Sequence, residues 1–266
     1  MPKIEETSTQ QVITKCDIPG IDYVINPYVG CEHSCVYCYA RFMKRFTGHT
    51  EPWGEFVDIK SNAADTIPTK SEKYRGRTLL LSSVTDPYQP LEKECKLTRQ
   101  ILKKLIPLQP NLQILTKSDL ITRDIDLLKQ FKQVEVGLTI TMLDEKIRKE
   151  IEPNAKPSAK RIEALKELHK AGLKTYVFVG PIMPYLTDWK EIIRQTKDYA
   201  DSYLIDKLNI KGTIGASINK WLKTHHPDLL AKYAEIYTDQ SDYWQHEKKE
   251  IEIFCKTKKI DCSSIL

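Results

Sequence analysis

The chain has 266 residues, of which 41% are hydrophobic and 29% charged, a composition typical of a globular protein that buries a substantial core. No apolar run approaches the roughly 18 residues of a transmembrane helix, and the polar start MPKIEETSTQ lacks the apolar segment of a signal peptide. We therefore expect a cytoplasmic location with reduced thiols, where seven cysteines do not form a disulfide framework. The net charge of +5 permits an anionic substrate or nucleic acid without arguing strongly for either.

The first third of the chain has weak periodicity. Residues 1–20 predict an irregular lead-in, and residues 23–28 predict a short strand that ends at Asn26-Pro27. A helix is expected over 36–46. Residues 47–76 are interpreted as an insertion, with a possible short strand at 56–59.

From residue 77 onwards, β-branched and apolar runs alternate with helical periods. Strands are predicted over 78–84, 112–116, 135–140, 175–179 and 203–208. Helices are predicted between and after them over 93–105, 119–130, 144–150, 158–171 and 189–200. This alternation indicates βα units around a parallel sheet. With the strand at 23–28 there are six strands, fewer than the eight of a closed barrel.

The expected fold is therefore α/β, a partial (β/α)6 TIM-type barrel over residues 21–210 with a helical C-terminal extension over 211–266. Helices of the extension are predicted over 214–223, 227–237 and 242–256. Lysines and aromatic residues alternate there. That pattern favours an amphipathic cap on the barrel, with nucleic-acid binding by phosphate contacts and base stacking as the alternative.

Three cysteines lie close together in the segment NPYVGCEHSCVYCYAR, residues 26–41, with the spacing Cys31-x3-Cys35-x2-Cys38. Thiolates are the usual ligands of iron–sulfur clusters. Three of them leave one iron of a [4Fe–4S] cluster free for a small molecule. That iron can chelate the amino and carboxylate groups of S-adenosylmethionine (SAM), and an electron passed to the sulfonium then releases a 5′-deoxyadenosyl radical.

A zinc site is the alternative interpretation of the same loop. Zinc usually takes four protein ligands in structural sites, and His33 would complete a Cys3His set. We prefer to interpret His33 as either a solvated loop residue or a donor to the cluster.

The cysteine motif, together with the words TDPYQPLE, LTKS and EPNA followed by RIEALKELHKAG, resembles the radical SAM superfamily, in particular the branch that includes spore photoproduct lyase. The resemblance runs from about residue 20 to 205. It implies a reductively cleaved SAM, an electron donor of the flavodoxin or ferredoxin type, and a cofactor site at the carboxyl ends of the strands.

The resemblance also assigns residues to SAM. Ser83, Thr85 and Asp86 stand where the superfamily contacts the methionyl amino group, although Asp86 before Pro87 also suits a turn cap. Lys117 and Thr139 stand where related enzymes contact the SAM carboxylate.

Two further positions are expected to face adenine. Tyr37 precedes the last cysteine, where the superfamily often has an aromatic residue, and Gly180 would let the backbone approach a flat ring closely. Glu152 and Arg161 are interpreted either as a link between the fourth loop and the cofactor site or as an ion pair that braces the barrel.

One departure from the relative concerns the substrate. Spore photoproduct lyase has a hydrogen-donating cysteine where this chain has Ser83, and a serine hydroxyl is a much poorer hydrogen-atom donor than a thiol. Thymine-lesion repair is therefore not expected. Cys95 is predicted to be a buried thiol, and Cys16, Cys255 and Cys262 remain as candidates for a second cluster or a hydrogen donor.

Three hypotheses follow for the function. The first is a radical SAM enzyme that abstracts hydrogen from an unidentified substrate. The second narrows it to repair or modification of DNA or tRNA by the same chemistry. The third is a non-catalytic binding module built on a zinc loop.

Overall fold

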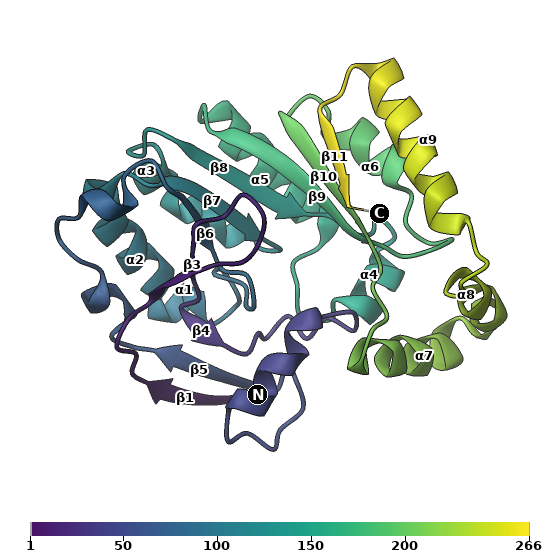
Figure 1. Ribbon diagram of the computed structural model, residues 1–266, viewed down its shortest axis with the longest axis horizontal. Coiled ribbons are helices and arrows are strands. Elements are labelled where there is room, and N and C mark those ends of the chain that lie inside the picture. The colour runs from purple at the N-terminus through teal and green to yellow at the C-terminus, as the bar shows by residue number, and fades with distance from the viewer. Residues whose placement is uncertain (1, 266) are drawn as a thin grey trace.

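A computed structural model describes residues 2–265, and its centre is an eight-stranded sheet in the order β11-β10-β9-β8-β7-β6-β3-β2 (Figure 1). All neighbouring pairs are parallel except β2 with β3. Its strands are β2 Ile13–Lys15, β3 Tyr23–Ile25, β6 Thr78–Leu81, β7 Asn111–Thr116, β8 Val134–Thr139, β9 Lys174–Ile182, β10 Ser202–Lys207 and β11 Cys262–Ile265. The six predicted strands correspond to β3 and β6 to β10. Because β2 and β11 are edge strands, the sheet is open, as in a partial barrel.

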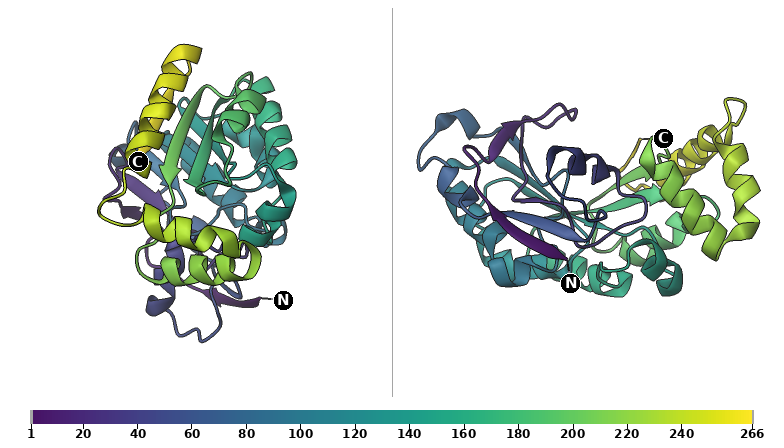
Figure 2. Two further views of the ribbon diagram at one scale, coloured as in Figure 1. Left: turned by 90° about the vertical axis from the view of Figure 1, so that its right-hand side faces the viewer. Right: turned by 90° about the horizontal axis from the view of Figure 1, so that it is seen from below.

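Side-chain alternation explains how the sheet is covered. In β7, Leu112, Ile114 and Thr116 are buried, whereas the residues between them are half-buried. The buried face packs against helices in one large apolar core, and the views in Figures 1 and 2 place α2, α3, α5 and α6 on that side. The helices along the sheet are α1 Glu92–Cys95, α2 Leu97–Leu105, α3 Ile125–Leu128, α4 Glu145–Ile151, α5 Ser158–Lys170 and α6 Trp189–Thr196. Short 3-10 helices at Ile106–Leu108 and Asp119–Asp124 flank α2 and α3.

A second, three-stranded sheet has the order β1-β5-β4, from Lys3–Thr7, Phe56–Lys60 and Tyr28–Val29. The possible strand at 56–59 is confirmed as β5. The irregular lead-in over 1–20 is wrong, because β1 and β2 lie there. The polar sequence of β1 shows no apolar alternation, and its partner β5 is some fifty residues away, so only tertiary pairing makes it a strand.

The segment after the cysteines is also different from the prediction. A 3-10 helix, η1, covers Tyr39–Phe46 in place of a helix over 36–46, and Cys38 before it has an extended backbone. Residues 36–38 therefore belong to the loop that carries the cysteines. The insertion contains β5 and two short 3-10 helices, Ala63–Thr66 and Glu72–Tyr74.

The C-terminal extension is helical as predicted, apart from its last strand. It consists of α7 Thr213–His225, a 3-10 turn at Pro227–Leu229, α8 Leu230–Ile236, α9 Tyr243–Lys258 and then β11. Trp221 and Tyr233 are buried in an apolar cluster with Met183 and Leu208, which supports the cap interpretation. No helix among residues 2–265 has the length and apolarity to span a bilayer.

Strand β11 adds to the sheet edge beside β10 and brings Cys262 to Cys255 of α9, with which it forms a disulfide. The Cα atoms are 6.2 Å apart, within the range that a disulfide spans. The expectation of reduced thiols is therefore wrong for this pair. In this form neither sulfur is available to a second cluster or as a hydrogen donor, whereas Cys16 and Cys95 are free and half-buried.

Candidate functional site

A cavity of about 530 Å³ lies at the carboxyl ends of the parallel strands. Residues from the ends of β6, β7, β8, β9 and β10 line it, and so does the cysteine loop, which we define as residues 30–38. Every site residue predicted from the sequence lines this one cavity: Cys31, Cys35, Cys38, Tyr37, Ser83, Thr85, Asp86, Lys117, Thr139 and Gly180. The residues predicted at the strand ends and in the cysteine motif therefore lie together in the fold.

The three cysteines of the loop are free thiols, with Cys31 and Cys35 buried and Cys38 half-buried. Burial raises the pKa of all three, that of Cys35 to about 12. Without a metal they are therefore protonated at neutral pH, and binding of an electrophilic metal centre would displace the protons. Three soft ligands grouped on one cavity wall fit an iron–sulfur cluster.

The cysteine loop starts with a glycine that no other residue can replace without a shift. Gly30 has a φ of +90°, and a Cβ there would lie 2.3 Å from the backbone oxygen of Phe56 in β5. Phe56 in turn packs with Cys31 and Trp53. Close contact between β5 and the loop therefore fixes the position of the first cysteine.

Hydrogen bonds from several elements hold the rest of the loop. Glu32 accepts from the amide of Leu91, its own amide donates to Gln89, and its carbonyl accepts from Asn154. Val36 donates its amide to the carbonyl of Ile151 at the end of α4. The loop is thus attached to segments that follow β6 and β8, where the cofactor is expected.

Asp86 is the most fully occupied carboxylate of the site. One oxygen accepts from the Tyr88 amide and the Thr116 hydroxyl, and the other from the Lys117 amide, with His33 Nδ1 at 3.3 Å. Burial alone would raise the pKa of Asp86, but His33 and these donors lower it to about 2. The turn-cap interpretation of Asp86 thus describes its contacts, and a contact with the SAM amino group stays a prediction.

His33 is buried at the cavity, and its contact with Asp86 orients the ring. This is the environment of a residue that supports the cysteine loop. Among residues 2–265 no ion pair or side-chain hydrogen bond joins the His33 ring to a cysteine, and its role as a fourth zinc ligand stays an alternative prediction.

Lys117 brings a positive charge to the cavity. Its ammonium lies 5.7 Å from the centre of the Tyr37 ring, and no ion pair or hydrogen bond engages it among the described residues. Burial alone would lower the pKa of Lys117, but Cys35, Glu152 and Asp86 nearby raise it above its ordinary value. A half-buried ammonium that makes no ion pair with the described residues fits an anionic group such as the SAM carboxylate.

Glu152 lies near Lys117 and forms an ion pair with Arg161 in the core of the fold. Its carboxylate accepts from the guanidinium of Arg161 and from the hydroxyl of Tyr37, and both charged side chains are fully buried. Arg161 also donates to the carbonyl of Thr139. Burial alone would raise the pKa of Glu152, but Arg161 and Lys117 lower it to about 2. The pair both braces the fold and fixes Tyr37, so the two interpretations of it hold together.

Two buried hydroxyls that line the cavity lack hydrogen-bond partners among the described residues. They belong to Ser82, which has a φ of +72° at the end of β6, and to Thr139, the last residue of β8. A buried polar group without a partner costs free energy, and such groups at a cavity fit a polar ligand. By contrast, the hydroxyl of Thr141, two residues further along the chain, donates to the carbonyl of Gly180.

The remaining predicted residues have partners of their own. Thr85 donates its hydroxyl to the carbonyl of Gly30, and the amide of Ser83 donates to Asn26. At Gly180 an added Cβ would lie 2.2 Å from the ring of Phe178, so this glycine makes room for that ring. The close neighbour of Gly180 in this structure is therefore the Phe178 ring, and an approach of adenine to Gly180 stays a prediction.

Sequence reasoning missed Asn26 and the end of β10. Asn26 Oδ1 accepts from the amides of Ser83 and Val84 and holds the β6 loop in place. In the sequence, Asn26-Pro27 indicates only the end of a strand. It does not predict that the Asn26 side chain holds another loop. We call Asp206–Asn209 the β10 rim, because these residues lie at or directly after the end of β10 and line the cavity. Asp206 there makes no ion pair and no hydrogen bond with another side chain among the described residues, and burial raises its pKa.

A family model described as the Radical SAM superfamily matches residues 25–196, and the chain belongs to this superfamily. Its members use SAM and typically a [4Fe–4S] cluster, and they need a reductant. The matched residues span the strands and loops that form the cavity.

Among the relatives, the uncharacterized protein MJ0683 of Methanocaldococcus jannaschii is 42% identical over 226 residues, which cover 85% of each chain. The Radical SAM Nalpha-GlyT isomerase of Pseudomonas phage M6 is 21% identical over 220 residues, 80% of this chain and 45% of that protein. A structure of spore photoproduct lyase complexed with dinucleoside spore photoproduct superposes with a TM-score of 0.62 at 16% identity and covers 84% of this chain and 67% of that one. This likeness establishes a shared fold.

Proposed function

We propose that the protein is a radical SAM enzyme in which Cys31, Cys35 and Cys38 bind a [4Fe–4S] cluster with one iron open to SAM. The single observation that carries the proposal is the placement of three free cysteines and the unpaired ammonium of Lys117 around one cavity at the strand ends. When bound, the cluster and SAM supply a 5′-deoxyadenosyl radical that abstracts hydrogen from a substrate.

The residues of the chain bind and orient the cofactor. Lys117 pairs with the methionyl carboxylate, and the hydroxyl of Thr139 donates to the same group. Ser83, Thr85 and Asp86 form the wall against the amino group, Asp86 mainly by holding the Lys117 backbone. Tyr37 and Gly180 lie on the adenine side, with Tyr37 fixed by Glu152.

Reductive cleavage of SAM tests the proposal. Protein reconstituted anaerobically with iron and sulfide, then given dithionite and SAM, is expected to form 5′-deoxyadenosine. A protein with a complete cluster that forms none would contradict the proposal. Metal analysis after anaerobic purification separates it from the zinc-loop module, since zinc without iron or sulfide would favour that module.

Repair or modification of a nucleic acid is a second, narrower candidate, and helix η1 favours it. Tyr39, Phe42 and Phe46 are 56%, 42% and 66% exposed, and the guanidinium of Arg45 lies 5.4 and 4.6 Å from the centres of the two phenylalanine rings. Exposed aromatic rings beside cations suit stacked bases and phosphates. Salt-sensitive binding of DNA or tRNA would support this candidate, and an absence of binding at low salt would count against it.

The chemistry at position 83 limits that candidate. Ser83 stands where spore photoproduct lyase has its hydrogen-donating cysteine, so repair of a thymine lesion by that route is not proposed. The source of the hydrogen atom that completes the reaction then depends on the substrate. So does whether SAM is consumed or recycled.

The electron donor is proposed to be a flavodoxin or ferredoxin, and the location to be cytoplasmic, where such carriers are found. The basic residues Lys44 and Arg45 lie in η1, a few residues after Cys38, and η1 contains no acidic residue. An acidic carrier would find a complementary surface there. When Lys44 and Arg45 are changed to glutamate, the rate of SAM cleavage should fall if a flavodoxin or ferredoxin supplies the electrons. It should stay unchanged if dithionite supplies them. A fall with both reductants would assign η1 to the substrate.

A further inference from the structure

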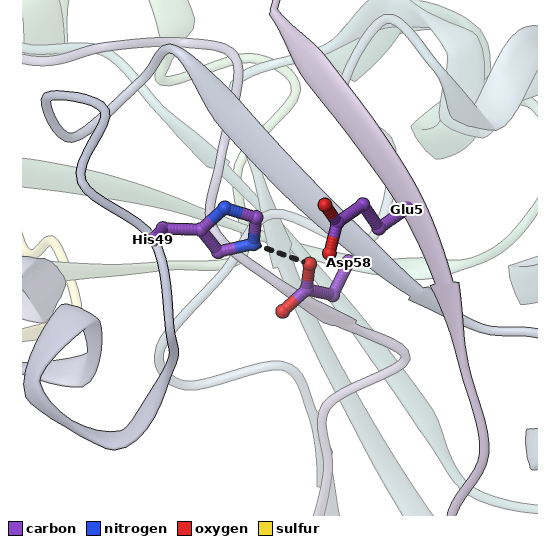
Figure 3. A group of neighbouring side chains, drawn as sticks. All are labelled: Glu5, His49 and Asp58. Atoms are coloured by element: carbon purple, nitrogen blue, oxygen red, sulfur yellow. Dashed lines mark hydrogen bonds and ion pairs between the residues drawn. The ribbon is translucent and has the colours of Figure 1, made fainter.

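A group of ionisable side chains outside the cavity lies on the small sheet (Figure 3). Glu5 of β1 and Asp58 of β5 are register partners in the parallel pair, so their side chains lie next to each other on one face. His49, from the segment between η1 and β5, points its Nε2 between them, 2.6 Å from Asp58 Oδ1. One possible ligand atom from each residue lies within 4.8 Å of those from the other two.

The imidazole of His49 is oriented from both sides. Its Nδ1 is 3.2 Å from Glu51 Oε2, and its ring is stacked on Phe56 with centres 4.2 Å apart and planes at 21°. The histidine side chain is 4% exposed and that of Asp58 is 10% exposed. A metal-binding histidine typically donates the N–H of one ring nitrogen to a carboxylate and binds the metal with the other. His49 has this arrangement, with Nδ1 beside Glu51 and Nε2 directed at Asp58 and Glu5.

The charges of the group are unbalanced if His49 is neutral. Three carboxylates, Glu5, Glu51 and Asp58, then face one cation, Lys3, whose ammonium is 2.8 Å from Glu5 and 3.6 Å from Glu51. Lys3 is half-exposed and lies at the rim, so it can keep Glu51 as a partner. The remaining two negative charges equal the charge of one divalent cation.

We propose that Glu5, His49 and Asp58 bind a divalent transition-metal ion, with Zn²⁺ as the reference ion and water as a further ligand. One imidazole with two carboxylates favours such an ion over Mg²⁺ or Ca²⁺, which prefer oxygen ligands alone. Glu51 is then a positioning residue, which keeps the proton on Nδ1 and leaves Nε2 for the metal.

The ion would have a structural role. It joins β1 to β5, and β5 contacts Gly30 and packs through Phe56 against Cys31. It would therefore fix the sheet from which the cysteine loop extends. Nothing in this inference depends on SAM chemistry, so either proposal can fail without the other.

The test uses Zn²⁺ binding to the 266-residue chain with Cys31, Cys35 and Cys38 changed to alanine, which removes the competing thiolates of the cysteine loop. Calorimetric titration should show one Zn²⁺ per chain. His49→Gln and Asp58→Asn should each weaken binding at least about 100-fold, and Glu51→Gln about 10- to 100-fold. The matched control is His226→Gln, which breaks another histidine–carboxylate contact, to Glu150 at 3.3 Å, and should leave Zn²⁺ binding unchanged.

A second measurement applies to the unaltered, reconstituted protein and does not depend on the alanine variant folding. Metal analysis should find zinc in addition to iron, and the zinc X-ray absorption spectrum should show nitrogen and oxygen neighbours without sulfur. Absence of binding to the parent chain, unchanged binding in His49→Gln, or sulfur neighbours around zinc would each overturn the inference. A protonated His49 that merely pairs with the carboxylates is the state that those results would indicate.

Discussion

The cysteine loop and the β10 rim both line the cavity, but they are held in very different ways. In the loop, Glu32, His33 and Tyr37 each contact a segment that follows another strand. In the rim, Asp206 has no partner from another side chain among the described residues, and burial raises its pKa. One wall is pre-organised for a fixed ligand, whereas the other keeps a free polar group. This difference is expected when cofactor chemistry is shared across a family and the substrate is not.

Removing a cluster ligand should have the largest effect. We expect Cys35→Ser to abolish both the iron–sulfur absorbance and 5′-deoxyadenosine formation, since two thiolates no longer hold the cluster. Thermal unfolding should confirm that the chain is still folded. The matched control is Cys95→Ser, a free and half-buried cysteine outside the cavity, which should keep the cluster. A complete, active cluster in Cys35→Ser would contradict the assignment of this loop.

Glu152→Gln tests how firmly the loop is supported. It leaves the guanidinium of Arg161 buried without its charged partner and weakens the attachment of Tyr37, which should cost about 3–5 kcal/mol in the free energy of unfolding. Urea denaturation measures this. Glu163→Gln on α5, the helix that carries Arg161, breaks the exposed pair with Lys160 and should cost less than about 1 kcal/mol. Equal costs would mean that the buried pair adds no special support.

Acid should lower the free energy of unfolding, because Asp86 and Glu152, which support the cysteine loop, become protonated. The pKa values of Asp86 and Glu152 are lowered to about 2, below the ordinary values of 3.8 and 4.5. Both groups therefore bind fewer protons when the chain is folded. Their contribution, on the order of 2–3 kcal/mol each, is present above pH 4.5 and is lost as pH falls towards 2.

Unfolding of cluster-free protein by urea between pH 6 and pH 3 measures this loss, and Asp86→Asn should flatten the profile. A wild-type profile that is flat over the same range would show that these carboxylates are not held as described.

Lys117→Met tests the proposed contact between the Lys117 ammonium and SAM. Loss of a charge-assisted hydrogen bond, roughly 1.5–3 kcal/mol, should weaken SAM binding to the reconstituted protein about 10- to 100-fold. Lys129→Met, at an exposed position, is the control and should bind SAM normally. If both variants bind SAM equally well, Lys117 does not contact the cofactor.

The smallest effect is expected at the β10 rim. Asp206→Asn should change the rate of SAM cleavage without substrate by less than about twofold, because the side chain supports no part of the cysteine loop. The timed yield of 5′-deoxyadenosine measures it. A large decrease would place Asp206 with the cofactor and remove the contrast between the two walls.

The sequence predicted the features that depend on residues close together in the chain. It did not predict those that depend on residues far apart. The cysteine spacing and the polar residues after each strand are local patterns, and the parallel sheet brings their positions to one edge by rule. The roles of Asn26 and the strand β1 depend on partners some fifty residues away, which no local periodicity reports. For Asp86 the resemblance predicts a SAM contact and the sequence predicts the local turn contact with Tyr88, but the three further neighbours of its carboxylate, Thr116, Lys117 and His33, are brought together only by the fold.

The C-terminal end shows a further limit. Helices α7 to α9 have clear periodicity, whereas the four residues of β11 become a strand only because the edge of β10 is free to pair. The same pairing unites Cys255 with Cys262, although their spacing matches no motif.

The most direct test of the central claim is electron paramagnetic resonance of the reduced, reconstituted protein with and without SAM. Chemical analysis of the same sample should find about four irons and four sulfides per chain. The account predicts a resonance signal that changes when SAM binds the iron that lacks a protein thiolate. A signal that SAM leaves unchanged, or a protein that takes up zinc in place of iron at Cys31, Cys35 and Cys38, would contradict it.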